Sequence, residues 1–176
     1  MHKQLMLLGF LLESPRHGYE LHQMVTAHGE LYADLKKANV YYLLDRLAKD
    51  GHLKIKAEDG ARGRRGERLI YAITAKGRRR FEQLLRDVLG TFEPAHTGLE
   101  VAVVFVNRLP RDEALAILER RRDAVIARRA RIAREFGDLA ARRLPGRLAA
   151  EHILGAIDAE LAWIDRALPR LRSEPG

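Results

Sequence analysis

Residues 37–57 read KANVYYLLDRLAKDGHLKIKA, and this stretch decides the fold. Its first part carries apolar residues at the spacing of one helical face, namely Val40, Leu43, Leu44 and Leu47. We therefore expect a helix over about residues 37–50, ended by Gly51, because glycine commonly follows the last turn of a helix. The alternating run Leu53–Ala57 then predicts a β-strand directly behind the helix.

The opposite face of this predicted helix is polar, and its residues are Asn39, Tyr42, Arg46 and Lys49. Lys36 and Lys37 stand at its start. An asparagine can bond the edge of adenine and an arginine or lysine that of guanine, and the major groove of DNA is wide enough for a helix. A helix face of this kind is also what an ordinary solvated surface looks like, so the pattern alone leaves both interpretations open.

A second β-like run, Leu69–Ile73, predicts a hairpin with Leu53–Ala57. The segment between the two runs contains three glycines and is rich in arginine, namely Arg62, Arg64, Arg65 and Arg68. Arginines on such a tip can lie along the DNA backbone or enter a narrow minor groove. An arginine-rich loop can equally serve only for solubility.

The flanking segments complete a recognisable order of elements. Lys3–Glu13 is apolar on almost every side, which predicts a buried helix. Ser14 and Pro15 suggest the start of a second helix that runs to about His28 and stops at Gly29. Thr74 is expected to cap a fourth helix. Helix, helix, helix, hairpin, helix is the order of a winged helix-turn-helix with a two-stranded wing.

The C-terminal half predicts long helices. Leu99–Leu109 is apolar and fits either a helix, which its context favours, or a buried strand. A long helix is expected over about Arg111–Arg143, then a turn at Pro145–Gly146. The last helix carries a regular apolar seam, namely Leu154, Ile157, Leu161, Ile164 and Leu168. These helices should form an antiparallel hairpin, and the seam could pack within one chain or join two copies in a dimer.

Positive charge is concentrated in the first half of the chain. The 176 residues hold 32 Lys and Arg against 24 Asp and Glu, for a net charge of +8. Residues 1–91 contain 17 basic and 11 acidic residues, whereas residues 92–176 contain 15 and 13. This balance indicates a polyanionic partner such as nucleic acid. We expect a DNA-binding domain at 1–91 and a helical dimerisation and effector region at 92–176.

The N-terminal half resembles the PadR family of bacterial transcriptional regulators. The matching stretches are Leu7-Leu8-Gly9-Phe10-Leu11, Pro15-Arg16-His17-Gly18-Tyr19-Glu20-Leu21, Val40-Tyr41, Leu44, Arg46-Leu47, Gly51, Tyr71, Ile73-Thr74 and Gly77. The helical second half is similar to that of the longer branch of the family. The resemblance implies a homodimer, an operator with two-fold character, and repression released by an effector. Ala38, Asn39 and Tyr42 depart from the family pattern, so the operator sequence cannot be carried over.

Further aromatic and histidine residues are candidates for DNA contacts. His17, Tyr19 and Tyr41 could meet phosphates, but the rings of the tyrosines could equally fill core space. His17, His22 and His28 are 5 and 6 residues apart, whereas a helical metal pair needs a spacing of 3 or 4. We therefore expect no metal and no cofactor.

The single tryptophan, Trp163, lies beside the seam of the last helix. It could line an effector pocket or simply plug an interface. Arg122 and Arg129 interrupt the seam of the preceding helix and could meet an anionic effector or pair with acidic residues of a partner.

Several classes of protein are disfavoured. The absence of cysteine excludes disulfides and thiolate chemistry, and no nucleotide loop or hydrolase motif occurs, so we do not expect an enzyme. The longest apolar run, Leu5–Leu12, is too short to span a membrane, which favours a cytoplasmic protein. The alternative to a repressor is a winged-helix module that binds nucleic acid non-specifically or binds other proteins.

Overall fold

A computed structural model describes residues 1–32, 37–57, 69–94, 97–137 and 143–173, and the side chains of residues 28–37 lie outside this description. The chain divides into two compact units, Met1–Pro94 and Ala95–Gly176.

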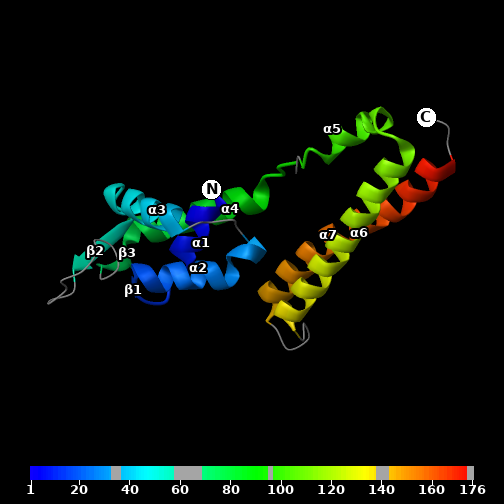
Figure 1. The fold of residues 1–176 in the computed structure, drawn as a ribbon. Coiled ribbons are helices and arrows are strands. Elements are labelled where there is room, and N and C mark those ends of the chain that lie inside the picture. Colours follow the sequence, from blue (N-terminus) through cyan, green and yellow to red (C-terminus); the bar gives the residue numbers. More distant parts are fainter. Residues whose placement is uncertain (33–36, 58–68, 95–96, 138–142, 174–176) are drawn as a thin grey trace. The chain divides into compact units, whose positions relative to one another are not determined.

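The first unit follows the predicted order of elements (Figure 1). Its helices are α1 (His2–Phe10), α2 (Gly18–Tyr32), α3 (Lys37–Lys49) and α4 (Ala75–Gly90). Its strands are β1 (Arg16–His17), β2 (Leu53–Ala57) and β3 (Leu69–Ile73). The predicted winged helix-turn-helix and its hairpin of β2 and β3 are confirmed.

The start of α2 differs from the prediction. Arg16 and His17 do not belong to the helix but form β1, which pairs antiparallel with β3, so the sheet has the order β1-β3-β2. The backbone N–H of His17 donates to the carboxylate of Glu20 at 2.8 Å. This bond satisfies a free donor at the helix start, in the way a capping-box glutamate does, so the helix begins at Gly18 without the proline. The helix also continues through Gly29, where we expected it to stop.

The core of this unit brings every helix and both strands of the hairpin together. Its buried members are Leu7, Leu8, Leu11, Leu21, Val25, Val40, Leu44, Leu47, Leu53, Tyr71 and Leu84. The short α1 contributes both Leu7 and Leu8, which agrees with its apolar sequence. Burial of side chains of this size stabilises a fold by about 1.5–3 kcal/mol each, so the packing fixes α3 firmly on its apolar side.

The second unit contains α5 (Leu99–Val104), the 3-10 turn η1 (Val106–Arg108), α6 (Arg111–Phe136) and α7 (Leu144–Ser173). The apolar segment 99–109 is thus helical, not a strand. The helix α6 ends at Phe136, earlier than expected, because Gly137 follows with a left-handed φ of 60°. The predicted turn at Pro145–Gly146 is wrong, since both residues lie in the first turn of α7, where proline is well tolerated.

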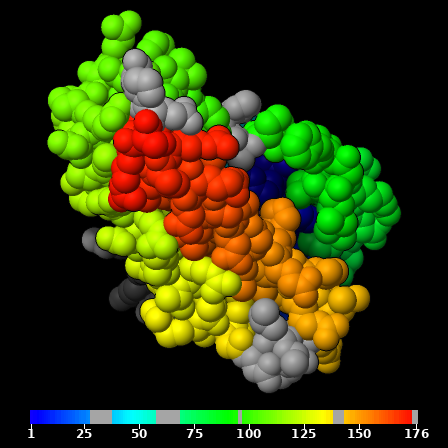
Figure 2. Space-filling model, turned by 90° about the vertical axis from the view of Figure 1, so that its right-hand side faces the viewer, coloured from blue at the N-terminus to red at the C-terminus, as the bar shows by residue number. Residues whose placement is uncertain are grey.

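The long helices α6 and α7 form the expected hairpin and lie side by side in both views (Figures 1 and 2). Buried residues of the two helices include Ile132, Phe136, Ile157 and Ile164. Ion pairs also join them, for example Arg121 to Glu160 at 2.6 Å and Arg122 to Asp165 at 2.6 Å. The apolar seam of the last helix therefore packs within the chain.

Within the described residues, no helix is both long enough and apolar enough to cross a membrane.

Candidate nucleic-acid interface and candidate effector cavity

The two faces of α3 differ sharply in exposure. Val40, Leu44 and Leu47 are at most 1% exposed and fix the helix on the core. The polar residues of the opposite face, Asn39, Tyr42, Arg46 and Lys49, are all exposed, and Tyr42 shows 63% of its surface. The structure thus brings the four predicted reading residues to one accessible helix face.

The end of α3 is fixed by backbone hydrogen bonds. Gly51, with a left-handed φ of 74°, donates its N–H to Ala48 O at 2.9 Å, and His52 donates to Leu47 O at 2.8 Å. These two bonds form a Schellman motif, in which glycine takes the conformation that other residues adopt at a cost. Gly51 therefore ends the helix as the sequence predicts.

The predicted aromatic and histidine contacts fall into two groups. Tyr19 is 45% exposed, and its ring stacks on that of His17 with centroids 5.5 Å apart. Tyr41 is only half-exposed and its hydroxyl oxygen is buried. That burial favours the packing alternative for Tyr41. Tyr19 is accessible at the β1–α2 junction, whereas His17 is only partly exposed and its Nδ1 is buried.

Tyr71 of β3 lies under the hairpin and is 1% exposed. Burial above all, together with the nearby Asp45 and Tyr41, raises the pKa of its phenol to about 12. The hydroxyl group is therefore neutral throughout the physiological range and acts as part of the core.

Some predicted DNA contacts lie outside the described residues, namely Lys36, Arg62, Arg64, Arg65 and Arg68. Lys37 opens α3, but its side chain is also outside the description. Sequence reasoning did not count Lys54 and Lys56, which are exposed on β2. The two lysines alternate with Leu53 and Ile55 in the sequence. This alternation indicates that both lysines lie on the same face of β2, because alternate residues of a strand point to the same face.

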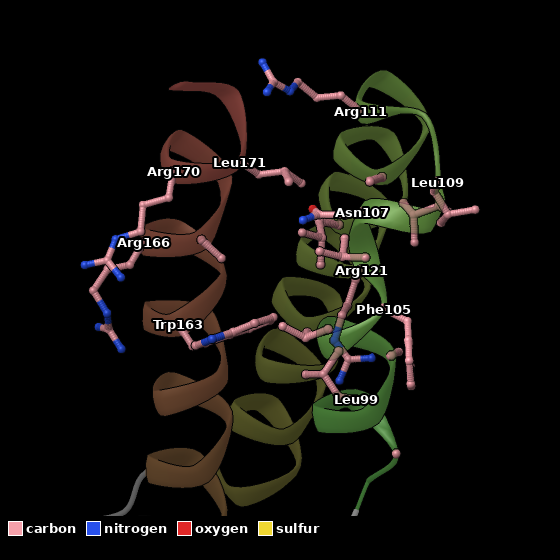
Figure 3. A pocket seen from close by; sticks show the side chains of 18 of the residues that line it. Leu99, Phe105, Asn107, Leu109, Arg111, Arg121, Trp163, Arg166, Arg170 and Leu171 are labelled. Carbon is pink, nitrogen blue, oxygen red and sulfur yellow. The ribbon is translucent and has the colours of Figure 1, made fainter. Parts of the chain in front are cut away.

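A cavity of about 1090 Å³ lies between α5, η1, α6 and α7 in the second unit. Its apolar lining includes Val103, Leu118 and Trp163. Arginines also line it, namely Arg111, Arg121, Arg166 and Arg170, and none of the described residues around it is acidic. Figure 3 shows Trp163 and Leu171 pointing from α7 toward α6, whereas Arg166 and Arg170 point outward.

The predicted effector residues are only partly brought together. Trp163 lines this cavity, but Arg122 and Arg129 do not. Arg122 pairs with Asp165, and Arg129 pairs with Asp158, so both arginines bind acidic residues of their own chain. Arg121, one residue away from Arg122, takes the place beside Trp163. The sequence could not separate these neighbours because the exact rotation of α6 against α7 depends on packing.

No group of three or more His, Asp or Glu residues in the described part of the chain is arranged to hold a metal ion.

Residues 7–83 match the transcriptional regulator PadR-like family. The chain carries a PadR-like domain. Proteins of this family are transcriptional regulators and not enzymes. No protein among those with curated descriptions matches the chain in sequence.

Solved structures show the same PadR fold over nearly the whole chain. Bacillus subtilis PadR in complex with operator DNA has 15% identity and a TM-score of 0.75, with 96% of this chain and 98% of that chain covered. The same protein with p-coumaric acid gives 15% identity and 0.76, covering 97% and 96%. The Vibrio cholerae virulence activator AphA gives 16% identity and 0.75, covering 97% and 98%. At these identities the likeness defines the fold alone.

Proposed function

We propose that this PadR-like protein is a homodimeric transcriptional repressor that binds an inverted-repeat operator and releases it when an effector binds. The region 1–91 binds DNA, and the region 92–176 provides the dimer contacts and the effector site. The observation that carries the proposal is the exposed polar face of α3 opposite a fully buried apolar face.

Each element of the first unit has a role in this proposal. Asn39, Tyr42, Arg46 and Lys49 read base edges from the major groove, because these side chains carry the donors and acceptors that the groove requires. Lys36, Lys37 and the hairpin arginines Arg62, Arg64, Arg65 and Arg68 neutralise phosphates, and His17 and Tyr19 near the start of α2 hydrogen-bond to phosphate oxygens. That Bacillus subtilis PadR was solved with operator DNA supports the proposal.

The dimer contact is best explained by α5 and η1. Neither element contains a buried residue, although α5 is strongly apolar and Val106 begins η1. Val101, Val104 and Phe105 are 63%, 76% and 59% exposed. A contiguous apolar surface of this kind is typical of a protein interface, and a second copy of the chain is the natural occupant. In this arrangement Leu154, Ile157, Leu161, Ile164 and Leu168 support the dimer by holding α7 on α6.

The cavity beside Trp163 is the proposed effector site. Its apolar lining suits a small hydrophobic body. That Bacillus subtilis PadR was solved with p-coumaric acid supports a small-molecule effector for this chain. Quenching of the single tryptophan gives a direct binding readout for candidate compounds.

A gel-shift titration with DNA from upstream of the protein's own gene tests the function. At roughly 150 mM salt a repressor should prefer one short inverted-repeat site over random duplexes by at least about 1000-fold. A reporter gene behind that site should be switched off by the wild-type protein. Such a regulator acts in the cytoplasm, where bacterial DNA lies.

The alternative is a non-specific nucleic-acid-binding module, which the net charge of +8 would support. Such a protein should lose most of its affinity at the same salt concentration and show no preferred site, because its binding depends on phosphate contacts alone. The same titration therefore separates the two functions.

A further inference from the structure

Four elements of the first unit meet at a single threonine. Thr74 follows the last residue of β3 and precedes α4, and it lies against the turn that joins α3 to β2. Its backbone N–H donates to His52 O at 3.0 Å. Its hydroxyl group lies 2.8 Å from Gly51 O and 3.1 Å from His52 O, and it accepts the N–H of Gly77 at 3.0 Å. One side chain thus connects the end of α3 with the start of α4.

Lys76 adds a second bond to the same turn. Its Nζ donates to Asp50 O at 2.7 Å. The carbonyl groups that follow α3 carry the negative end of the helix dipole, so an ammonium group there is favourable. Asp50, Gly51 and His52 therefore each have a carbonyl group held by the start of α4.

Gly77 allows this close approach. A Cβ atom at position 77 would lie 2.2 Å from His52 O and 2.8 Å from the side chain of Ile73. Both distances are far shorter than normal contacts, and one of the atoms belongs to backbone. Any side chain at this position would push α4 away from the turn that ends α3.

We propose that Thr74, Lys76 and Gly77 are positioning residues for DNA reading. They fix the angle of α3 relative to the hairpin of β2 and β3, because they hold the turn that joins α3 to β2. At the base of this hairpin, Leu53 pairs with Ile73, which directly precedes Thr74. This inference rests on the proposed function of α3. It adds that sequence preference depends on side chains that do not touch DNA.

The central test uses Thr74→Val and Thr74→Ser in the full chain. Valine has nearly the shape of threonine but no hydroxyl group, whereas serine keeps the hydroxyl. Thr26→Val is the matched control, because Thr26 also bonds a backbone carbonyl, that of His22 at 2.9 Å, but on α2. Each variant is titrated against the duplex that the wild-type protein selects from a random pool and against the unselected pool.

Thr74→Val should lower the preference for the selected duplex about tenfold or more, while binding to the unselected pool stays within about twofold. Thr74→Ser and Thr26→Val should keep the wild-type preference. Gly77→Ala should behave like Thr74→Val. Equal weakening on both DNAs, or an unchanged preference in Thr74→Val, would overturn the proposal and leave the bonds a role in stability alone.

A second measurement does not depend on DNA. The chain has no cysteine, so Asp45→Cys on α3 and Lys56→Cys on β2 provide two unique sites for spin labels. The distance distribution between the labels should broaden in Thr74→Val and stay narrow in Thr74→Ser. A narrow distance distribution in Thr74→Val would contradict the positioning role, whatever the DNA titrations show. A wild-type protein that selects no duplex would instead contradict the proposed function.

Discussion

Arg129 of α6 donates from Nε and Nη2 to the two carboxylate oxygens of Asp158 on α7. This two-point pairing of planar groups restricts both side chains in orientation, unlike a single bond to a lysine. The sequence suggested an effector contact for Arg129, but its charge is matched inside its own hairpin. Interfacial arginines can therefore be assigned only when the counter-ions on the neighbouring helix are known.

This pair predicts an acid-sensitive contribution to stability. The hydrogen bond from Arg129 lowers the pKa of Asp158 below its ordinary value of 3.8. A carboxyl group with a lowered folded-state pKa stabilises the fold above its ordinary pKa, and that contribution is lost as the pH falls through the folded-state value. Asp158→Asn should therefore melt at a slightly lower temperature than wild type at pH 7, and this difference should shrink as the pH falls below 3.8. A difference that persists in acid would contradict the assignment.

The neutral phenol of Tyr71 predicts an effect at the other end of the pH scale. Because its folded-state pKa is raised to about 12, the stabilisation is complete below the ordinary value of 10.0 and is lost as the pH rises toward 12. Ultraviolet titration should show a tyrosine that ionises near pH 12. In Tyr71→Phe this late step should be absent, and its persistence would assign it to another tyrosine.

Leu44 anchors the buried face of α3 and is fully buried. Leu44→Ala should lower the free energy of unfolding by about 2–5 kcal/mol, because it removes packed methyl groups and leaves a cavity. Leu89→Ala on α4, where the side chain is 79% exposed, is the control and should change it by less than about 0.5 kcal/mol. Urea titration followed by circular dichroism measures both, and similar losses would contradict the described core.

The proposed dimer surface is tested by Val104→Asp. A buried unpaired carboxylate at the interface should produce a monomer in light scattering at micromolar concentration, whereas the proposed function expects the wild type to be a dimer there. Leu148→Asp near the start of α7, also an apolar side chain and 55% exposed, is the control and should leave a dimer. If only Leu148→Asp yields a monomer, the interface lies near the N-terminal end of α7 and not at α5.

Base reading and phosphate binding should respond differently to mutation. Asn39→Ala or Arg46→Ala should relax preference at one base pair by about 1–3 kcal/mol. Arg64→Ala combined with Arg65→Ala should weaken binding on all sequences and flatten its salt dependence, because fewer counter-ions are released. Arg86→Ala, which removes an exposed ion pair with Glu82 on α4, is the control. If Arg46→Ala weakens binding equally on all DNA sequences, α3 contacts the DNA backbone and does not read bases.

Local patterns predicted much of the fold. The periodic spacing of Val40, Leu44 and Leu47 gave the buried face of α3, and Gly51 and Thr74 gave a helix end and a helix start, because each signal acts within a few residues. The strand β1 could not be predicted, since two residues have no periodicity and pair with β3 more than fifty positions away. Leu99–Val104 remained ambiguous because its β-branched residues fit either structure.

The candidate sites were predicted less completely than the fold. The polar face of α3 followed directly from helical spacing, and its exposure agrees with that prediction. The cavity beside Trp163 depends on how α5, η1, α6 and α7 pack, so the sequence identified the tryptophan but chose Arg122 where Arg121 lines the space. The role of Gly77 needed coordinates, because a close approach to His52 O leaves no mark in the pattern of residues.

The ion pairs between α6 and α7 have a geometric consequence. Glu119 pairs with Arg172, Arg122 with Asp165 and Arg129 with Asp158. The residue numbers rise along α6 as they fall along α7, as expected for antiparallel helices. Sliding either helix by a single turn would separate all of these partners at once. Together these pairs favour one alignment of the two helices, so tilting or turning the hairpin as a whole costs fewer contacts than sliding one helix along the other.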